Sequence, residues 1–159
     1  MPLTRVTPKL LVSGQPSLAE IADLPAHGVA GLLNNRPDGE EPGQPGAAAE
    51  RAAAEAAGLA YADLPVTGDT ITRDDVRRFR ETVAAAPGPV LAHCRGGTRS
   101  LTLHVLGEVL DGRMRREDVL AYGAGLGFDL TGALAWLRRH APDLTGDAGT
   151  GNADTGETP

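Results

Sequence analysis

The residues best suited to chemistry follow an apolar run in the middle of the chain, which ends on the only cysteine. The segment reads Val90-Leu91-Ala92-His93-Cys94-Arg95-Gly96-Gly97-Thr98-Arg99-Ser100. A glycine-containing loop in front of a helix can surround an anion with unpaired backbone N–H groups, and the helix end adds partial positive charge. Gly96 and Gly97 allow the loop to curl, and the planar guanidinium of Arg99 can hold an oxyanion such as phosphate with two hydrogen bonds. We therefore expect an anion-binding loop here.

Cys94 has two interpretations. A thiol held in the same positive concavity has its pKa lowered from about 8.5 into roughly the 3.5–7.5 range of activated cysteines, and so becomes a thiolate near neutral pH. A lone cysteine at the end of a buried strand is otherwise an inert, small apolar residue. Two glycines, two arginines and a helix start directly after Cys94 are hard to explain as core packing, and they favour the reactive thiol.

The composition is that of one globular domain without basic surfaces. The 159 residues suffice for a single domain with a real core, built mainly from Leu, Val and Ala because aromatic residues make up only 3%. A net charge of −6 argues against a nucleic-acid or membrane-surface protein, since both depend on basic patches. The predicted partner is a small anionic or phosphorylated substrate that is held locally.

The single cysteine excludes an intramolecular disulfide and any metal site built from several cysteines, and the four histidines show no ligand spacing. We therefore expect neither a metal nor another cofactor. Residues 1–14 lack the apolar core of a signal peptide, and no segment reaches the length of a membrane span. These observations predict a cytoplasmic protein.

Alternating apolar segments predict the elements that must position this loop. Short apolar runs predict strands at residues 3–6, 10–13, 29–33, 59–66 and 90–93. Capping-box sequences begin two helices, at Ser17-Leu18-Ala19-Glu20 and at Thr72-Arg73-Asp74-Asp75. Further helices are predicted over 47–57, from 99 to 110, near 117–122 and over 130–140, with a loop at Gly123, Gly125 and Gly127. Residues 143–159 are predicted to be a disordered tail, which leaves a domain of residues 1–142.

Strands that alternate with helices predict an α/β fold, a mostly parallel sheet flanked by helices on both faces. Ligands of such sheets bind beyond the carboxyl ends of the strands. Cys94 directly follows the strand predicted at 90–93 and therefore lies at such an end. The predicted architecture and the predicted anion loop thus agree.

The Cys94 loop resembles the signature loop of cysteine-dependent protein phosphatases, in which His-Cys is followed by two residues, Gly, two residues, Arg, and Ser or Thr. The segment from His93 to Ser100 matches this pattern, except that one residue instead of two stands between Gly97 and Arg99. Four residues rather than five therefore separate the cysteine from the arginine. That shorter spacing is found in many rhodanese-type sulfurtransferases.

From about Pro8 to Leu137 the chain is similar to a small bacterial family, the beta-lactamase-hydrolase-like phosphatases, whose members have been labelled both phosphatase and sulfur transferase. The shared landmarks besides the Cys94 loop are Ser13-Gly14-Gln15, Asn34-Asn35-Arg36-Pro37-Asp38-Gly39-Glu40 and Leu64-Pro65-Val66. The resemblance implies a dual-specificity-phosphatase-like catalytic domain. It also points to sulfide metabolism, because relatives occur fused to persulfide-oxidising metalloenzyme domains.

By position, this resemblance makes Cys94 the nucleophile and Arg99 the clamp on the oxyanion. The backbone amides that would form the anion cradle are those of Gly96, Gly97, Thr98 and Arg99. Ser100 matches the hydroxyl that helps the thiolate leave. His93 matches a residue that orients the loop and tunes the thiol, and it fits a satisfied histidine at a strand end equally well. Arg95 is not part of the signature and adds positive field.

A phosphatase also needs a general acid, which protonates the leaving oxygen and then activates water against the cysteinyl-phosphate. In the dual-specificity enzymes an aspartate lies on a loop a few tens of residues before the cysteine, and Asp69 matches that position best. Asp69 stands in Gly-Asp-Thr, a sequence that is equally typical of a turn.

The loop that contains Asn35 and Arg36 holds two rivals for the role of the acid, Asp38 and Glu40. A structural interpretation competes with this one. Arg36 can pair with either carboxylate and so support the loop, and we favour that interpretation.

Three functions remain open from the sequence. The first is a phosphomonoester hydrolase that works through a Cys94-phosphate intermediate. The second is a sulfurtransferase in which Cys94 carries a persulfide, as the shorter loop indicates. The third is a non-catalytic oxyanion-binding module that keeps the cradle but lacks an acid. We rank the phosphatase first.

Overall fold

The computed structural model describes residues 1–144. The strands are β1 (Thr4–Thr7), β2 (Leu10–Ser13), β3 (Gly31–Asn34), β4 (Ala60–Asp63) and β5 (Val90–His93). The α-helices are α1 (Leu18–Asp23), α2 (Ala47–Ala56), α3 (Arg73–Ala85), α4 (Thr98–Leu110), α5 (Val119–Gly125) and α6 (Thr131–His140). Two 3-10 turns, η1 and η2, cover Leu24–His27 and Arg116–Asp118. The predicted tail, residues 143–159, lies almost wholly outside the described residues.

The chain divides into two compact units, residues 1–101 and the residues from Thr102 onward. The first unit contains all five strands with α1, α2 and α3, and the start of α4. The second contains the rest of α4 together with α5 and α6. Over the part of the chain that the structure describes, no helix is both long and apolar enough to span a membrane.

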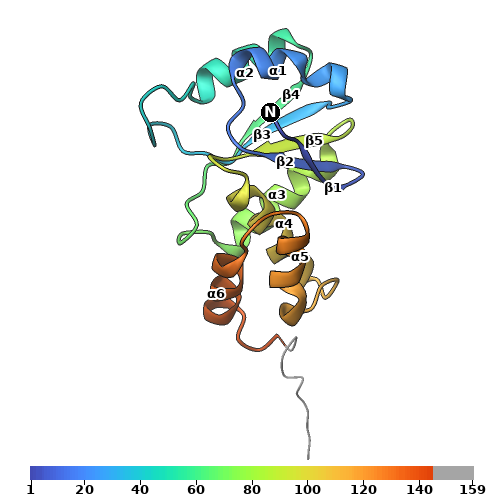
Figure 1. The fold of residues 1–159 in the computed structure, drawn as a ribbon, viewed down its shortest axis with the longest axis vertical. Helices are drawn as coiled ribbons and strands as arrows, with labels where there is room; N and C mark the ends of the chain where they lie inside the picture. The colour runs from blue at the N-terminus through green and yellow to red at the C-terminus, as the bar shows by residue number, and fades with distance from the viewer. Residues whose placement is uncertain (145–159) are drawn as a thin grey trace, which may run out of the picture. The chain divides into compact units, whose positions relative to one another are not determined.

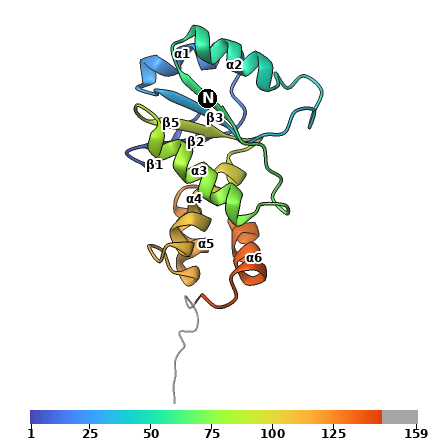
Figure 2. The ribbon, with the colours of Figure 1, turned by 180° about the vertical axis from the view of Figure 1, so that it is seen from behind.

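The five strands form one sheet in the order β1-β2-β5-β3-β4 (Figure 1). β1 pairs with β2 in antiparallel fashion, and the other three pairings are parallel. The helices α1 and α2 cover one face of this sheet and α3 covers the other, as both views show (Figure 2). The predicted α/β class with a mostly parallel sheet is therefore confirmed.

The register brings four strand ends into one row. His93, the last residue of β5, pairs with Ser13 on β2 and with Asn34 on β3, and Asn34 pairs in turn with Asp63 on β4. The four segments that leave these residues therefore start side by side at the carboxyl edge of the sheet, where ligands of parallel sheets bind.

Both predicted capping boxes are present. Ser17 Oγ accepts the N–H of Glu20 at 3.1 Å, and the Glu20 carboxylate accepts the N–H of Ser17 at 2.8 Å. Thr72 and Asp75 make the same reciprocal pair at 3.1 and 3.0 Å. Each box satisfies N–H groups that a helix start leaves without partners, which fixes where α1 and α3 begin.

Alternate strand residues face the two helical layers, because side chains of a strand point to opposite faces in turn. The cluster on the α1 and α2 side contains Leu11, Ile21, Leu24, Val29, Leu32, Ala54, Leu59 and Leu91. On the other side α3 buries Val76 and Phe79. The aliphatic residues of α4 are buried nearly all round that helix, as predicted from its sequence.

Most predicted boundaries differ from the observed ones by one or two residues, but the strand predicted at 59–66 differs by more. The predicted strand 59–66 is shorter, because Pro65 has no N–H to continue the ladder. The chain nevertheless stays extended there, since the residues on either side of Pro65 donate to the carbonyl oxygens of Asn34 and Asn35 at 2.8 and 3.1 Å.

The predicted glycine loop after residue 122 is partly helical. Gly123 and Gly125 lie inside α5, and only Gly127, with φ 88°, belongs to the turn that follows. A Cβ built on Gly123 would lie 2.6 Å from Leu130 Cγ. Gly123 is thus a helical residue that permits close packing within the second unit, not a helix breaker.

Candidate active site

Cys94 begins the short loop between β5 and α4. Its side chain is almost fully buried, with 1% exposure, and its Sγ accepts the backbone N–H of Gly97 at 3.0 Å. Gly97 has φ 99°, a conformation that L side chains rarely adopt, so glycine is required for this N–H to turn inward. Gly96 is exposed, and Thr98 begins α4. The predicted loop before a helix start is therefore present, with a backbone donor directed at the sulfur.

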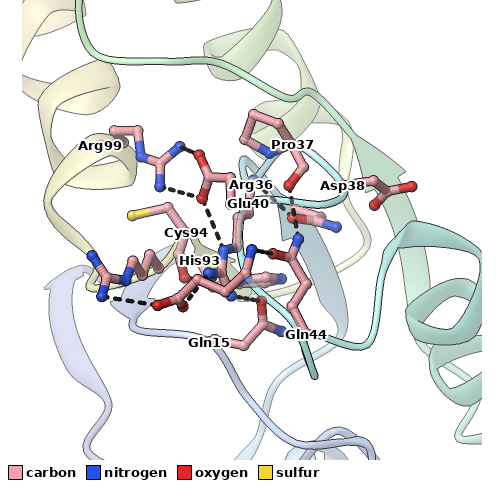
Figure 3. Close-up of polar contacts among 12 residues, drawn as sticks. Gln15, Arg36, Pro37, Asp38, Glu40, Gln44, His93, Cys94 and Arg99 are labelled. Atoms are coloured by element: carbon pink, nitrogen blue, oxygen red, sulfur yellow. Dashed lines mark hydrogen bonds and ion pairs between the residues drawn. The ribbon is translucent and has the colours of Figure 1, made fainter.

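Arg99 lies in the first turn of α4 and reaches back across the loop (Figure 3). Its two terminal nitrogens donate to the two carboxylate oxygens of Glu40 at 2.7 and 2.9 Å, and Nη1 also donates to the carbonyl oxygen of Val66 at 3.0 Å. Hydrogen bonds to Glu40, followed by the charge of the Cys94 sulfur, raise the pKa of Arg99. Arg99 thus lies between the thiol and the Glu40 carboxylate, which accepts hydrogen bonds from both terminal nitrogens of the guanidinium.

Arg36 holds the loop that carries Glu40. It is buried, with 3% exposure, and its Nε donates to Glu40 at 2.9 Å. Its other two nitrogens donate to Glu41 at 2.6 Å and to Gln15 at 3.1 Å. The predicted pairing of Arg36 with a loop carboxylate is confirmed for Glu40. Arg99 first, and Arg36 second, lower the pKa of Glu40 from 4.5 to about 2.

The second predicted carboxylate of this loop has a different task. Asp38 Oδ1 accepts the backbone N–H of Ala47 at 2.8 Å, in the first turn of α2. An acceptor at this place satisfies one of the N–H groups that the helix start leaves open. Asp38 therefore anchors α2 to the loop and does not pair with Arg36.

Asn35 and Ser100 connect this loop to α4. Ser100 Oγ donates to Asn35 Oδ1 at 2.8 Å, and Asn35 Nδ2 donates to the carbonyl oxygen of Leu64 at 2.9 Å. The N–H of Asn35 also donates to the carbonyl oxygen of His93 at 2.8 Å. Both side chains are fully buried. These bonds fix the segment that follows β3 against the cysteine-containing strand.

A second buried pair lies on the other side of the cysteine. His93 Nε2 lies 2.7 Å from Oε1 of Glu50, and both side chains have at most 1% exposure. The other oxygen of Glu50 accepts the amide N–H of Gln15 at 2.8 Å. Sequence reasoning missed Glu50. Its one signal is that it stands four residues before the buried Ala54 in an alanine-rich helix, on the face turned to the sheet.

Two further predicted residues lie nearer the surface. Arg95 is exposed, and it pairs with Glu41 at 3.0 Å. Asp69 is also exposed and accepts the hydroxyl of Thr67 at 3.1 Å, within the turn that begins at Thr67. The structure therefore brings Arg95 to the carboxylates of the Arg36 loop and holds Asp69 in a turn.

A pocket of about 550 Å³ lies beside the Cys94 loop. Its polar lining includes Gln15, Arg36, Glu41, Gln44 and Arg95. Within residues 1–144, no group of three or more histidine, cysteine, aspartate and glutamate side chains could hold a metal ion.

The fold is that of phosphatase-like proteins. A putative phosphatase from Neisseria meningitidis superposes with a TM-score of 0.77 at 30% identity, covering 86% of this chain and 96% of that one. Two more distant structures share the fold: Pseudomonas aeruginosa TpbA in complex with phosphotyrosine (TM-score 0.66, 23% identity, 86% and 82% coverage) and Tk-PTP in its active form (0.64, 19%, 86% and 93%).

The family is shown by sequence. Residues 2–111 match the phosphatase-like domain of the beta-lactamase hydrolase-like proteins, and the chain belongs to this family. Beta-lactamase hydrolase-like proteins from Agrobacterium fabrum and Xylella fastidiosa are 51% and 48% identical over 141 residues. Those matches cover 89% of this chain and 33% of each relative, so the chain spans about a third of their length. The resemblance stated from the sequence is confirmed.

Proposed function

We propose that this chain hydrolyses phosphomonoesters through a cysteinyl-phosphate intermediate. One observation carries the proposal. The Cys94 sulfur accepts the Gly97 N–H at the head of α4, and the guanidinium of Arg99 lies beside it. A backbone donor, a helix N-terminus and a cation all favour the thiolate over the thiol, and the thiolate is the nucleophilic form.

The proposed reaction uses the groups in sequence. The amides of Gly96, Thr98 and Arg99 and the guanidinium of Arg99 hold the phosphoryl oxygens, while the Gly97 N–H stays on the sulfur. Cys94 Sγ attacks phosphorus while the bond to the leaving oxygen breaks. A general acid gives that oxygen a proton. The same group, now without its proton, takes a proton from water as the water attacks phosphorus, the S–P bond breaks, and the electron pair returns to sulfur. In the proposal the Ser100 hydroxyl, which donates to Asn35 Oδ1 in the structure, turns from that acceptor to the departing thiolate.

Of the three candidate carboxyl groups for the general acid, two are engaged in other contacts. Glu40 is ionised at neutral pH, because its pKa lies at about 2, and has no proton to give. Asp38 is engaged at the start of α2. Asp69 remains the proposed acid, and its exposed turn leaves it able to approach a bound substrate.

The substrate proposed is a small phosphorylated molecule whose remaining part enters the pocket beside Arg95. That pocket presents arginine, glutamine and glutamate side chains, which suit a polar group carrying charge. Three statements from the sequence stay predictions: the location in the cytoplasm, the catalytic domain of residues 1–142 and the disordered tail of residues 143–159.

Sulfur transfer is the second candidate, and one observation favours it. Four residues separate Cys94 from Arg99, one fewer than in the phosphatase pattern. Attack of the Cys94 thiolate on the outer sulfur of thiosulfate breaks the S–S bond, leaves a persulfide on Cys94 and releases sulfite, an anion that needs no proton at the moment of cleavage. Such a reaction therefore does not depend on Asp69.

The test compares both reactions in one preparation. Wild type, Cys94→Ser and Arg99→Lys are assayed with an aryl phosphate, and Cys94 is examined by mass spectrometry after incubation with thiosulfate. Arg77→Lys is the matched control, because Arg77 is an exposed arginine on α3 that pairs with Asp74 and Glu81. We expect turnover that both site variants abolish and the control keeps. Equal rates in wild type and Cys94→Ser would overturn the phosphatase proposal, and an added sulfur on Cys94 would favour the second candidate.

A further inference from the structure

The Glu50 carboxylate lies in the core beside the strand that carries the cysteine. Its exposed fraction is 1%, and its two oxygens face one donor each: the ring of His93 at 2.7 Å and the amide of Gln15 at 2.8 Å. Burial of a carboxylate is strongly unfavourable to folding unless the group is paired and hydrogen-bonded. The two groups that Glu50 contacts, His93 and Gln15, therefore indicate its role.

The surroundings of His93 indicate the charge of its ring. Nε2 faces the Glu50 carboxylate, and Nδ1 faces the carbonyl oxygen of Cys94 at 3.3 Å. The carbonyl oxygen is an acceptor, and so is the Glu50 carboxylate in its ionised form. An imidazole ring that donates to both of them carries a positive charge. An ionised Glu50 next to it compensates that charge in a region from which water is excluded.

We propose that Glu50 is a positioning residue that acts through His93: it keeps the ring doubly protonated and oriented, so that a fixed positive charge stabilises the Cys94 thiolate. The inference rests on the proposed function only in taking Cys94 to react as a thiolate. It adds Glu50 to the site. This residue lies in α2, 44 positions before the cysteine, and is not part of the signature loop.

The same carboxylate is tied to the oxyanion side of the site. Gln15 donates to Glu50 with its amide nitrogen and accepts Arg36 Nη1 with its amide oxygen at 3.1 Å. Arg36 in turn holds Glu40, which holds Arg99. Glu50 therefore stands at one end of a chain of hydrogen bonds that runs from the cysteine-bearing strand to the arginine of the fork.

The charge of the ring can be measured without any variant. Nitrogen-15 NMR of histidine-labelled wild-type protein distinguishes a ring with two N–H groups from a neutral tautomer. We expect both nitrogens of His93 to be protonated at pH 7. A ring with one bare nitrogen at that pH would overturn the proposal.

The effect on the thiol is measured by alkylation, because the chain has a single cysteine. The ratio of the iodoacetamide rate at pH 6 to the rate at pH 8.5 reports the fraction of Cys94 that is ionised at pH 6. The accessibility of the sulfur to the reagent affects both rates equally and cancels. Glu50→Gln keeps the shape and removes the carboxylate charge that holds the second proton on the ring. We expect this ratio to fall severalfold, less than the roughly tenfold effect of one uncompensated unit charge, because the lost positive charge of the ring is offset in part by the lost negative charge of the carboxylate. Glu50→Asp should keep most of the ratio. Glu55→Gln, an exposed glutamate on the same helix, is the matched control and should leave it unchanged.

A double-mutant cycle separates action through His93 from a merely structural role. Glu50→Gln should have no further effect on the ratio when it is added to His93→Asn. Effects that multiply, or a folded Glu50→Gln protein with the wild-type ratio, would overturn the proposal. None of these measurements needs phosphatase turnover, so a failure of the proposed function is distinguishable from a failure of this one.

Discussion

Replacing Glu40 by glutamine changes the occupant of the Arg99 fork without changing its shape. In the structure Glu40 takes both terminal nitrogens of Arg99, the same groups that would hold two phosphoryl oxygens. An incoming oxyanion therefore competes with a carboxylate of the chain itself. We expect Glu40→Gln to bind inorganic phosphate more tightly than wild type.

The size of the effect follows from the charge interaction. The fall in the pKa of Glu40 from 4.5 to about 2 corresponds to about 3 kcal/mol of interaction with the two arginines. The carboxylate is a quarter exposed, so solvent screens part of it, and about 1–2 kcal/mol is a reasonable share for Arg99. Phosphate affinity should therefore rise by roughly 5–30-fold.

Titration calorimetry at constant ionic strength measures this affinity, with Cys94→Ser as the common background so that no covalent step intervenes. Glu41→Gln is the matched control, because Glu41 pairs with Arg36 and Arg95 but not with Arg99. Weaker phosphate binding in Glu40→Gln would refute the reasoning. It would mean that Glu40 serves chiefly to hold Arg99 in position and that the ordering of the guanidinium outweighs the competition.

Three further predictions concern the supports of the site. The lowered pKa of Glu40 adds stability that is present above pH 4.5 and lost as the pH falls towards 2, so chemical denaturation should show a smaller loss over that interval in Glu40→Gln than in wild type. Gly14→Ala places a Cβ 2.9 Å from the carbonyl oxygen of Arg95, and should cost about 1–3 kcal/mol of unfolding free energy and lower kcat; an unchanged melting temperature would contradict this. Ser100→Ala leaves the buried Asn35 Oδ1 without its donor, and should cost about 1–3 kcal/mol in the same denaturation experiment, whereas wild-type stability would show that the bond is not needed.

Local signals gave the elements and the place of the cysteine. The capping boxes at Ser17 and Thr72 are contained within four residues each, and such contacts can be recognised from the sequence because the backbone fixes their geometry. The apolar run of residues 90–92 before His93 and Cys94 likewise predicted a strand end from neighbouring residues alone. The prediction for Gly123 was wrong because its role depends on contact with the side chain of Leu130. Glycine occurs both in turns and where a helix packs closely, so the residue type alone does not distinguish the two.

The polar network of the site could not be predicted in the same way. The partners in its two main contacts are 59 residues apart for Arg99 and Glu40, and 43 apart for His93 and Glu50. Only the register of the sheet brings them together, and no local pattern contains that register. The sequence offered Glu40 as a rival acid and, in the favoured interpretation, as a partner of Arg36. Its second partner, Arg99, was not predicted.

The choice between phosphoryl and sulfur transfer depends on this network more than on the length of the loop. A phosphate ester needs the Arg99 fork for its oxygens, so Glu40 must give way before the chemistry begins. Attack on the outer sulfur of a thiol persulfide brings no oxyanion to this fork and needs only the thiolate, which accepts the Gly97 N–H. A shorter loop by itself leaves both reactions open, because it removes neither the thiol nor the guanidinium. The free energy that releases Glu40 from Arg99 is therefore the quantity that separates the two activities, and the glutamine variant should raise hydrolysis of phosphate esters while leaving persulfide formation on Cys94 unchanged.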